Sequence, residues 1–400
     1  MRTVETSMLT GGILSWLLAT AAFCEFVGVD LKTCGDAPEP PGALVEALDK
    51  LLKDTVDPVG AYSKDGMNAP GAVLLVRSTD WAYFKAAGIS DFDNSAQLEC
   101  EMPFEIGSAT KMVTGTVLMQ LQEEGRLNLT DPLQAHLPEI AGRLPFGDLI
   151  TLRHLATHTS GVFSYTDDAP DGTPGIMEGA LKNPDMLAVS RTPAELVEFA
   201  IAHGEPSFEA GADGHWSYSN TGYILLGLII EKLEQAPLAE VFKRRVFEPA
   251  GMANTFLWND VPSPEVGLSR AWYKAPFDLE TTGWNLSQGW AAGGIISTAP
   301  DMALFIERLM AGWLFAKAGT LDAMADGVPA PYPNLSYGIG LIGKPGDMFG
   351  HGGQTMGFES DTAHSPTSGT TIVFWTNSAS STAVLGVPLI TMALDGAKVQ

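Results

Sequence analysis

EIGSATK, residues 105–111, places the hydroxyl of Ser108 and the amine of Lys111 three residues apart, ahead of an apolar segment that runs from Met112 to Gly125. In a helix that rises about 1.5 Å per residue, such a pair shares one face and is separated by about 4.5 Å along the axis. The Lys111 amine can therefore reach the Ser108 hydroxyl. A lysine that burial keeps neutral accepts a proton, so the spacing predicts a nucleophilic serine.

Two distant motifs strengthen the interpretation of Ser108 and Lys111 as catalytic residues. A serine and a lysine at this spacing are, by themselves, more often a surface contact. Tyr218-Ser219-Asn220 opens a second apolar helix, expected over 223–233, and His351-Gly352-Gly353 precedes a segment patterned like a β-hairpin. The order and wide separation of the three motifs indicate that a folded site brings them together.

The three motifs together resemble those of the penicillin-recognising serine hydrolases: D-alanyl-D-alanine carboxypeptidases, class C β-lactamases and related esterases and D-amino-acid peptidases. A Ser-x-x-Lys signature opens the active site of this superfamily. Tyr-Ser-Asn in second place is similar to the class C and carboxypeptidase branch. The segments 150–161 and 291–298 also look like segments of this family, so the resemblance covers about residues 70 to 380.

The resemblance implies an acyl-enzyme mechanism, with roles that the residue chemistry supports. Ser108 attacks a carbonyl group, and Lys111 and Tyr218 are two candidate bases whose order of action the sequence leaves open. Asn220 donates an amide hydrogen bond to Lys111 or to the substrate. Ser108, Lys111 and Tyr218 are thus the predicted catalytic residues.

The third motif is expected to bind the substrate. By resemblance, His351, Gly352 and Gly353 lie on the strand that lines the pocket, and the backbone amides of Ser108 and Gln354 form the oxyanion hole. Histidine stands where β-lactamases usually have lysine. A neutral imidazole binds a carboxylate less strongly than an ammonium does, which favours an esterase or aminopeptidase specificity over recognition of β-lactams or C-terminal D-alanine.

The functional hypothesis is a serine hydrolase that acts through an acyl-enzyme on a small-molecule or peptide substrate. It is most like a D-alanyl-D-alanine carboxypeptidase or D-amino-acid peptidase. A carboxylesterase or β-lactamase of the same superfamily is the first alternative, and a non-catalytic binding protein on this fold is the second. No cofactor and no metal are expected: His154 and His158 are four residues apart, but no His-Glu-x-x-His motif occurs, and a structural role accounts for both.

The composition is that of a folded protein with an acidic surface. The 400 residues are 45% hydrophobic, enough for one large domain or two adjoining lobes, and the formal net charge is −24. Such a charge disfavours nucleic acid and anionic membranes as partners. The oligomeric state is left open.

The N-terminus resembles an export signal. An apolar segment, Ile13 to Phe23, is too short to span a bilayer and contains a small-x-small cleavage site, Ala19-Thr20-Ala21. Residues 1–21 are therefore read as a signal peptide rather than an anchor or an ordinary helix. We therefore expect a secreted or periplasmic protein with no stable membrane span after processing. The Pro- and Gly-rich residues 22–42 are interpreted as a linker. Cys24, Cys34 and Cys100 allow at most one disulfide and are read as isolated thiols.

The expected fold class is α+β: an antiparallel sheet built from both termini and flanked by helices, with an inserted, mainly helical lobe. Residues 43–400 form this domain, with a sheet lobe over about 43–107 and 290–400 and a helical lobe over about 108–289. The elements that carry this prediction are a helix over 44–52, strands over 72–76 and 82–89, helix starts at Thr192 and Thr298, a hairpin over 358–364 and 371–376, and a closing helix over 384–394.

Overall fold

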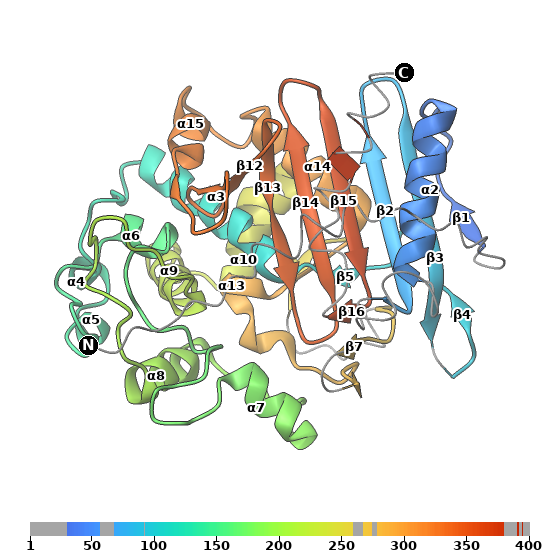
Figure 1. Cartoon of the computed structure of the whole chain (residues 1–400). Helices are drawn as coiled ribbons and strands as arrows, with labels where there is room; N and C mark the ends of the chain where they lie inside the picture. Colours follow the sequence, from blue (N-terminus) through green and yellow to red (C-terminus); the bar gives the residue numbers. More distant parts are fainter. Residues whose placement is uncertain are drawn as a thin grey trace.

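The computed structural model describes residues 30–56, 68–91, 93–258, 267–273, 278–379, 390–391 and 394 (Figure 1). The strands of its largest sheet are β1 (Leu31–Thr33), β2 (Gly71–Arg77), β3 (Ala82–Asp91), β4 (Ala96–Gln97), β10 (Val328–Pro329), β11 (Ser336–Tyr337), β12 (Ile342–Lys344), β13 (Met348–Gln354), β14 (Glu359–Ser365) and β15 (Thr370–Thr376). Two small sheets contain β5 (Phe104–Glu105), β6 (Phe256–Leu257) and β9 (Ile295–Ser297), and β7 (Trp272–Tyr273), β8 (Leu279–Glu280) and β16 (Ser378–Ala379).

The helices lie mostly between the two groups of strands in the sequence. They are α2 (Gly42–Val56), α3 (Thr110–Glu123), α4 (Leu133–His136), α5 (Pro138–Ala141), α6 (Leu152–Ala156), α7 (Ile176–Lys182), α8 (Pro193–His203), α9 (Asn220–Glu234), α10 (Leu238–Phe242), α11 (Glu248–Ala250), α13 (Trp290–Gly293), α14 (Ala299–Met310) and α15 (Thr320–Ala325). Shorter helical turns are η2 (Gly107–Ala109), η3 (Pro184–Met186), η4 (Lys243–Phe247) and η5 (Leu286–Gln288).

The large sheet joins both ends of the chain. Its order is β1-β3-β2-β15-β14-β13-β12-β11-β10, with β4 paired to β3, and the neighbouring strands are antiparallel. Strand β2 pairs with β15, which lies about 300 residues later (Val73 opposite Trp375). The helical part fills the other half of the molecule (Figure 1). The predicted fold class, including the strands from both termini and the inserted helices, is therefore confirmed.

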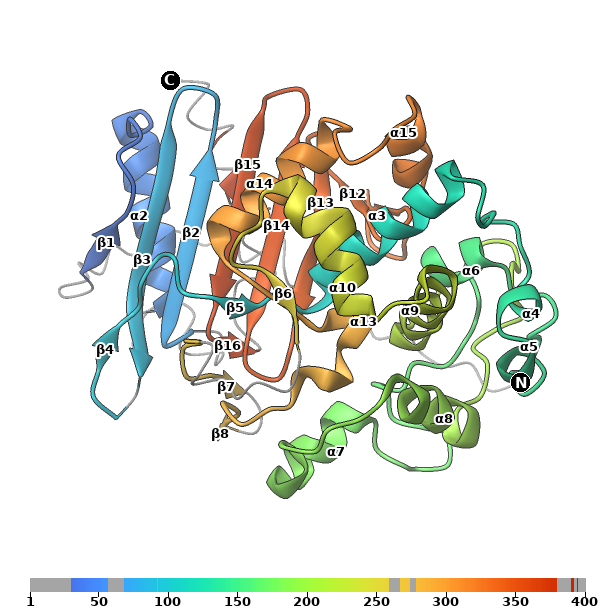
Figure 2. The same ribbon diagram turned by 180° about the vertical axis from the view of Figure 1, so that it is seen from behind.

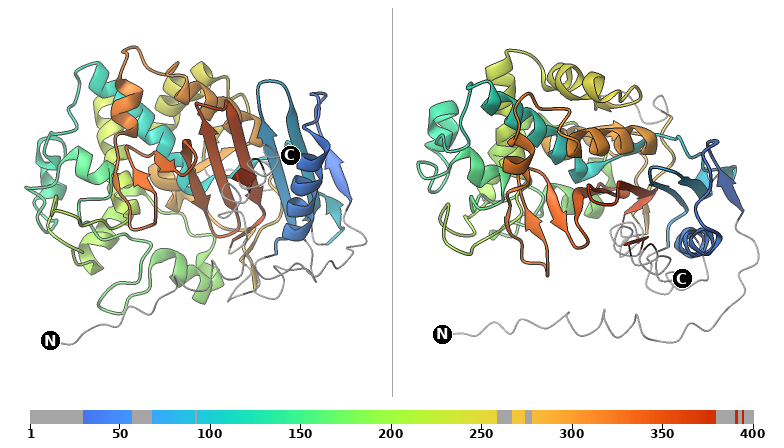
Figure 3. Two further views of the ribbon diagram at one scale, coloured as in Figure 1. Left: turned by 45° about the horizontal axis from the view of Figure 1, so that its top comes forward. Right: turned by 90° about the horizontal axis from the view of Figure 1, so that it is seen from above.

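Helices cover both faces of the sheet, as the views in Figures 2 and 3 show. Strand β2 is buried on both sides because its alternate residues enter two cores. Ala72, Leu74 and Val76 belong to a core with α2, whereas Val73 and Leu75 belong to the main core with α3, α9 and α14. The long apolar runs of the sequence thus match a sheet between two helical layers.

The predicted helix starts are present. The Thr192 hydroxyl accepts from the Glu195 amide at 3.3 Å, and the Glu195 carboxylate accepts from the Thr192 amide at 2.7 Å, which completes a capping box. Thr298 caps α14 through the Asp301 amide at 3.3 Å. The hairpin of β14 and β15 is also as predicted.

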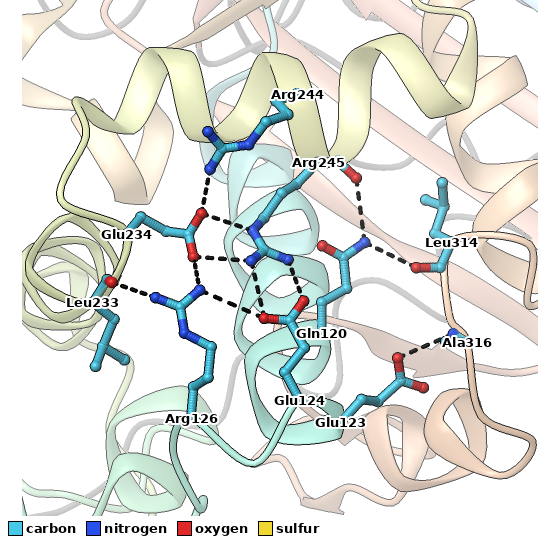
Figure 4. Close-up of polar contacts among 10 residues, drawn as sticks. All are labelled: Gln120, Glu123, Glu124, Arg126, Leu233, Glu234, Arg244, Arg245, Leu314 and Ala316. Carbon is cyan, nitrogen blue, oxygen red and sulfur yellow. Dashed lines mark hydrogen bonds and ion pairs between the residues drawn. The ribbon is translucent and has the colours of Figure 1, made fainter.

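A network of charged side chains ties together the C-terminal ends of α3 and α9 (Figure 4). The carboxylate of Glu234, whose side chain is only 3% exposed, contacts the guanidinium groups of Arg126, Arg244 and Arg245. Arg245 also binds Glu124 through two bonds of 2.7 and 3.1 Å. The network thus anchors η4 to the end of the helix that begins with the Ser108 motif.

Two expectations for the N-terminal region need correction. Cys34 and Cys100 form a disulfide, so they are not isolated thiols. The predicted linker, 22–42, contains β1, which pairs with β3, so its described part belongs to the edge of the sheet. This strand could not be predicted from the sequence, because three residues are too few to show a period. The Pro and Gly residues that follow it favoured a linker instead.

Some predictions fall outside the described residues. These are the signal peptide 1–21, Cys24 and most of the closing helix 384–394. Within the part of the chain that the structure does describe, none of the helices combines the length and apolar character needed to cross a membrane.

Candidate active site

The first two predicted motifs meet around the amine of Lys111. Strand β5 leads through η2 into α3, so Ser108 lies in the turn that opens the helix and Lys111 in its first residues. Lys111 Nζ is 3.0 Å from Ser108 Oγ, 2.7 Å from Asn220 Oδ1 and 2.7 Å from the Ala292 carbonyl oxygen. The lysine side chain has no exposed surface. The amine is therefore held among three oxygen atoms from η2, α9 and α13.

This environment favours the neutral form of the lysine. Burial lowers the pKa of Lys111 well below its usual value of 10.5, because an ammonium loses its hydration there. A neutral amine has two N–H groups and one lone pair. The oxygens of Asn220 and Ala292 can only accept, so they take the two N–H groups and leave the lone pair for the Ser108 hydroxyl. The arrangement suits a proton acceptor.

Asn220 is held in one orientation by neighbours on the loop after α6. Its Nδ2 donates to Thr166 Oγ1 at 3.0 Å, and its backbone amide donates to Ser164 Oγ at 3.2 Å. Ser219 caps α9 by accepting from the Gly222 amide at 3.3 Å. Since the amide nitrogen is engaged by Thr166, the Asn220 oxygen faces Lys111 and accepts from its amine, so the predicted donation from Asn220 to Lys111 is wrong in direction.

Tyr218 lies beside both Ser108 and Lys111. Its phenol is hydrogen-bonded to Ser108, and its ring centroid is 4.8 Å from Lys111 Nζ. Burial raises the pKa of Tyr218, and the contact with Ser108 opposes this rise only in part. The phenol is thus neutral and can donate a proton, whereas the sequence left open whether it acts as an ionised base.

His158 positions Tyr218, a role that the sequence analysis did not assign. The amide of Ser217 donates to the His158 carbonyl oxygen at 3.0 Å, and the amide of Ser219 donates to His158 Nδ1 at 3.1 Å. The His158 ring lies 4.2 Å from the Tyr218 ring, and its backbone has a φ of 61°, which is rare outside glycine. Burial lowers the pKa of His158 well below 6.5.

His351 on β13 is 3% exposed, and it lies in the wall of a pocket beside Ser108. Its Nδ1 donates to the Gly352 carbonyl oxygen at 2.5 Å, so its Nε2 accepts from the Tyr337 hydroxyl at 2.8 Å. Burial, with a smaller effect of Lys111, lowers the pKa of His351 to about 3. The imidazole is neutral, and both of its nitrogens are used within the protein.

The backbone of the third motif lies directly against the serine turn. Gly107 has a φ of 53°, and a Cβ at this position would lie 2.6 Å from the Gln354 amide nitrogen. A Cβ on Gly353 would lie 1.8 Å from the Ile106 carbonyl oxygen. Both positions therefore require glycine, and their close approach brings the backbone of Ser108 beside that of Gln354.

Two pockets have Ser108 and Gln354 in their walls. The first, called here the aromatic pocket, has a volume of about 810 Å³ and includes Gly352, Gly353 and Gln354 in its walls. Its aromatic walls are Trp216, Tyr218, Tyr332 and Tyr337. The second, called the narrow pocket, has a volume of about 50 Å³. Its walls include Tyr165, Met177, Asn220, Trp284 and Gly293.

A larger pocket of about 1030 Å³ lies around residues 247–257, away from this chemistry. It contains none of the predicted site residues. The candidate active site is therefore at Ser108, where the reactive groups lie, although a larger pocket exists elsewhere.

The two histidines that were weighed as metal ligands serve the backbone instead. His154 Nδ1 accepts from the Thr151 amide at 3.3 Å and completes the capping box of α6, and His158 holds the segment around Tyr218. Within the described ranges, His, Cys, Asp and Glu form no group of three that could hold a metal ion.

Comparison with known proteins places the chain in a family. It matches the model of the Beta-lactamase family over residues 52–391. It is 28% identical over 312 residues to the putative penicillin-binding protein PbpX of Bacillus subtilis, which covers 77% of this chain and 70% of that protein. It is 26% identical over 278 residues to the D-alanyl-D-alanine-carboxypeptidase/endopeptidase AmpH of Escherichia coli, covering 69% of this chain and 66% of that protein.

Solved structures agree. A D-stereospecific amidohydrolase from Streptomyces sp. has a TM-score of 0.71 and 30% identity, covering 83% of this chain and 94% of the other. The D-amino acid amidase from Ochrobactrum anthropi SV3 has a TM-score of 0.74 and 25% identity, covering 89% and 99%. With the matched range spanning most of the chain, this protein belongs to the beta-lactamase family of serine hydrolases.

Proposed function

We propose that this enzyme hydrolyses an amide or ester bond next to a D-amino acid, as in D-alanyl-D-alanine-type peptides or D-amino-acid amides, through an acyl-enzyme on Ser108. The observation that carries the proposal is the buried Lys111 amine, 3.0 Å from Ser108 Oγ, whose other two contacts are oxygens that can only accept. The choice of D-amino-acid substrates is supported by the names of the amidohydrolase, amidase and carboxypeptidase relatives.

Acylation follows from the protonation states of the site. Ser108 Oγ attacks the carbonyl carbon while its proton passes to the neutral Lys111 amine. The backbone amides of Ser108 and Gln354 donate to the carbonyl oxygen as it gains negative charge. The C–N or C–O bond then breaks, and the leaving amine or alcohol takes a proton from the Tyr218 phenol, which Lys111 resupplies.

Deacylation reverses these transfers with water as the nucleophile. The attacking water gives a proton to the Tyr218 oxygen as the phenol passes its own proton to the neutral Lys111 amine, and Lys111 then returns a proton to Ser108 Oγ as the carboxylic acid departs. Asn220 keeps the lysine aligned through both half-reactions. Each of these groups returns to its starting protonation state, so no cofactor is needed to balance the reaction.

Covalent labelling tests the proposal. A fluorophosphonate and a labelled penicillin are each incubated with the enzyme, and the modified peptide is identified by mass spectrometry. The fluorophosphonate is expected on Ser108, and labelling of Ser108 by the penicillin as well would favour a peptidase. Ser108→Ala is expected to lose labelling and turnover of D-alanyl-D-alanine peptides, D-amino-acid amides and short esters. Turnover retained by Ser108→Ala would refute the mechanism. Saturable ligand binding by the native protein without hydrolysis or adduct would favour a binding protein instead.

A carboxylesterase is the second candidate. It is favoured by His351, whose two ring nitrogens are engaged by Gly352 and Tyr337 and are thus withheld from a substrate carboxylate. Labelling of Ser108 by the fluorophosphonate but not by the penicillin would favour this candidate.

We also infer that the protein is exported, with residues 1–21 as a signal peptide and residues 43–400 forming most of the catalytic domain. The disulfide between Cys34 and Cys100 supports an oxidising compartment outside the cytoplasm. The intact mass of the protein recovered outside the cytoplasm, compared with that of the full chain, checks whether the leader is cleaved.

A further inference from the structure

One wall of the aromatic pocket carries an ion pair, whereas the rest of its lining is largely apolar. Among its lining residues, Lys344 from β12 is the cation, and Glu359 and Asp361 from β14 are carboxylates. Lys344 Nζ is 2.5 Å from Asp361 Oδ1, and the two side chains are only 12% and 4% exposed. The pair lies next to the third motif, because a Cβ on Gly352 would be 3.8 Å from the Asp361 carboxylate.

The aromatic pocket is the side on which the leaving group would depart, a step that rests on the proposed function. Tyr218, which would protonate the leaving group, lines the aromatic pocket and not the narrow one. Asn220 lines the narrow pocket and not the aromatic one. With Ser108 in both linings, the acyl part of a substrate faces the narrow pocket and its amine or alcohol faces the aromatic pocket.

A leaving group with a free carboxylate lacks a partner there. In the described lining, the cation is Lys344, whose charge is already matched by Asp361. His351 is neutral and has no free ring nitrogen. A carboxylate that enters this pocket must either displace Asp361 from its lysine or stay unpaired beside two carboxylates, and both outcomes are unfavourable next to side chains that are only 12% and 4% exposed.

We propose that Asp361 neutralises Lys344 so that the aromatic pocket accepts uncharged leaving groups, such as the amine of an amide or the alcohol of an ester, and rejects those that carry a free α-carboxylate. The enzyme is then an amidase or esterase with a narrow acyl site, rather than a carboxypeptidase. Asp361 and Lys344 determine specificity, and removal of the aspartate charge frees a lysine that can bind a carboxylate.

The test uses two substrates that differ by one charge. N-acetyl-D-alanyl-D-alanine has the free carboxylate, and its C-terminal amide is uncharged. The values of kcat/KM for cleavage of the D-alanyl–D-alanine bond in both are measured with the native enzyme, Asp361→Asn, Lys344→Met and a control variant, Asp49→Asn. Asp49 forms a similar pair with Lys85, 2.8 Å apart, on α2 and β3 outside both pockets. The control therefore removes one negative charge from the protein without altering the site.

We expect the native enzyme to prefer the amide by about tenfold or more, the scale of one unfavourable charge placed in a partly buried site. Asp361→Asn should shift the ratio toward the free carboxylate by about tenfold, Lys344→Met should leave the preference for the amide or increase it, and Asp49→Asn should keep the native ratio. A native enzyme that cleaves the free peptide as well as its amide overturns the inference, whether or not the variants fold. So does an Asp361→Asn ratio equal to that of Asp49→Asn.

Failure of the proposed function gives a different result. If neither substrate is cleaved and a fluorophosphonate does not modify Ser108, the acyl-enzyme mechanism itself is refuted, and the specificity inference is refuted with it. If Ser108 is modified and both substrates are cleaved equally well, only the specificity inference is lost.

Discussion

Replacing Glu234 by glutamine removes the carboxylate that Arg126, Arg244 and Arg245 share at the ends of α3 and α9 (Figure 4). Glutamine keeps the shape and one acceptor oxygen but not the charge. Because the Glu234 side chain is 3% exposed, the three guanidinium groups lose a partner that water replaces poorly. Glu234→Gln is therefore expected to lower the free energy of unfolding.

Two estimates give an upper limit for this loss. Removing one partner of a buried ion pair costs about 3 to 5 kcal/mol. Burial raises the pKa of Glu234, but hydrogen bonds from Arg245 and Arg126 outweigh it and hold the pKa at about 2 instead of 4.5, a difference worth on the order of 3 kcal/mol. Arg126 and Arg244 are 35% and 57% exposed, so solvent screens part of this gain. We expect a loss of about 2 kcal/mol, or about 3 °C in Tm for a chain of this length.

The contribution of Glu234 to the free energy of unfolding depends on pH. Since folding lowers the pKa of Glu234, its contribution is present above pH 4.5 and is lost as the pH falls toward about 2. Thermal unfolding followed by circular dichroism, from pH 7 down to pH 2.5, should show a gap in Tm between the native protein and Glu234→Gln that shrinks below pH 4.5.

The matched control is Glu198→Gln. Glu198 binds Arg143 through two bonds of 2.7 and 2.9 Å, but both side chains are about half exposed, so this change should leave Tm within error of the native value. Equal Tm values for Glu234→Gln and Glu198→Gln at pH 7 would refute the reasoning. A gap that stays constant down to pH 2.5 would refute the assigned protonation of Glu234.

Three further predictions concern the site and the edge of the sheet. The kcat/KM should rise with pH through the lowered pKa of Lys111 and be level by pH 10, because only the neutral amine accepts the serine proton; a profile still rising above pH 10.5 would contradict it. Gly107→Ala should lower kcat by about 100-fold or more in steady-state assays, since its Cβ meets the Gln354 amide at 2.6 Å. Reduction of the Cys34–Cys100 disulfide should lower Tm, with an unfolding free energy reduced by about 2 to 4 kcal/mol, and no change in Tm would count against a structural role.

The local parts of this protein follow from its sequence. The Ser108 and Lys111 contact is a consequence of helical spacing, and the helix starts at Thr192 and Thr298 follow from side chains that bind amides three residues away. The hairpin of β14 and β15 is likewise predicted by the pattern of residues on either side of a short turn. These features depend on neighbours within a few positions, where periodicity and capping are informative.

The contacts between distant segments depend on tertiary packing. Asn220 and Ala292 lie 109 and 181 residues beyond Lys111, yet their oxygens orient its amine. The His158 contacts around Tyr218, the pairing of Lys344 with Asp361, and β1 are also set by how the sheet and the helices pack. Sequence alone identified the residues of the three motifs, because motif and local spacing name them. Only the tertiary structure decided which of them touch and which are neutral, because burial and long-range register depend on the packed core as a whole.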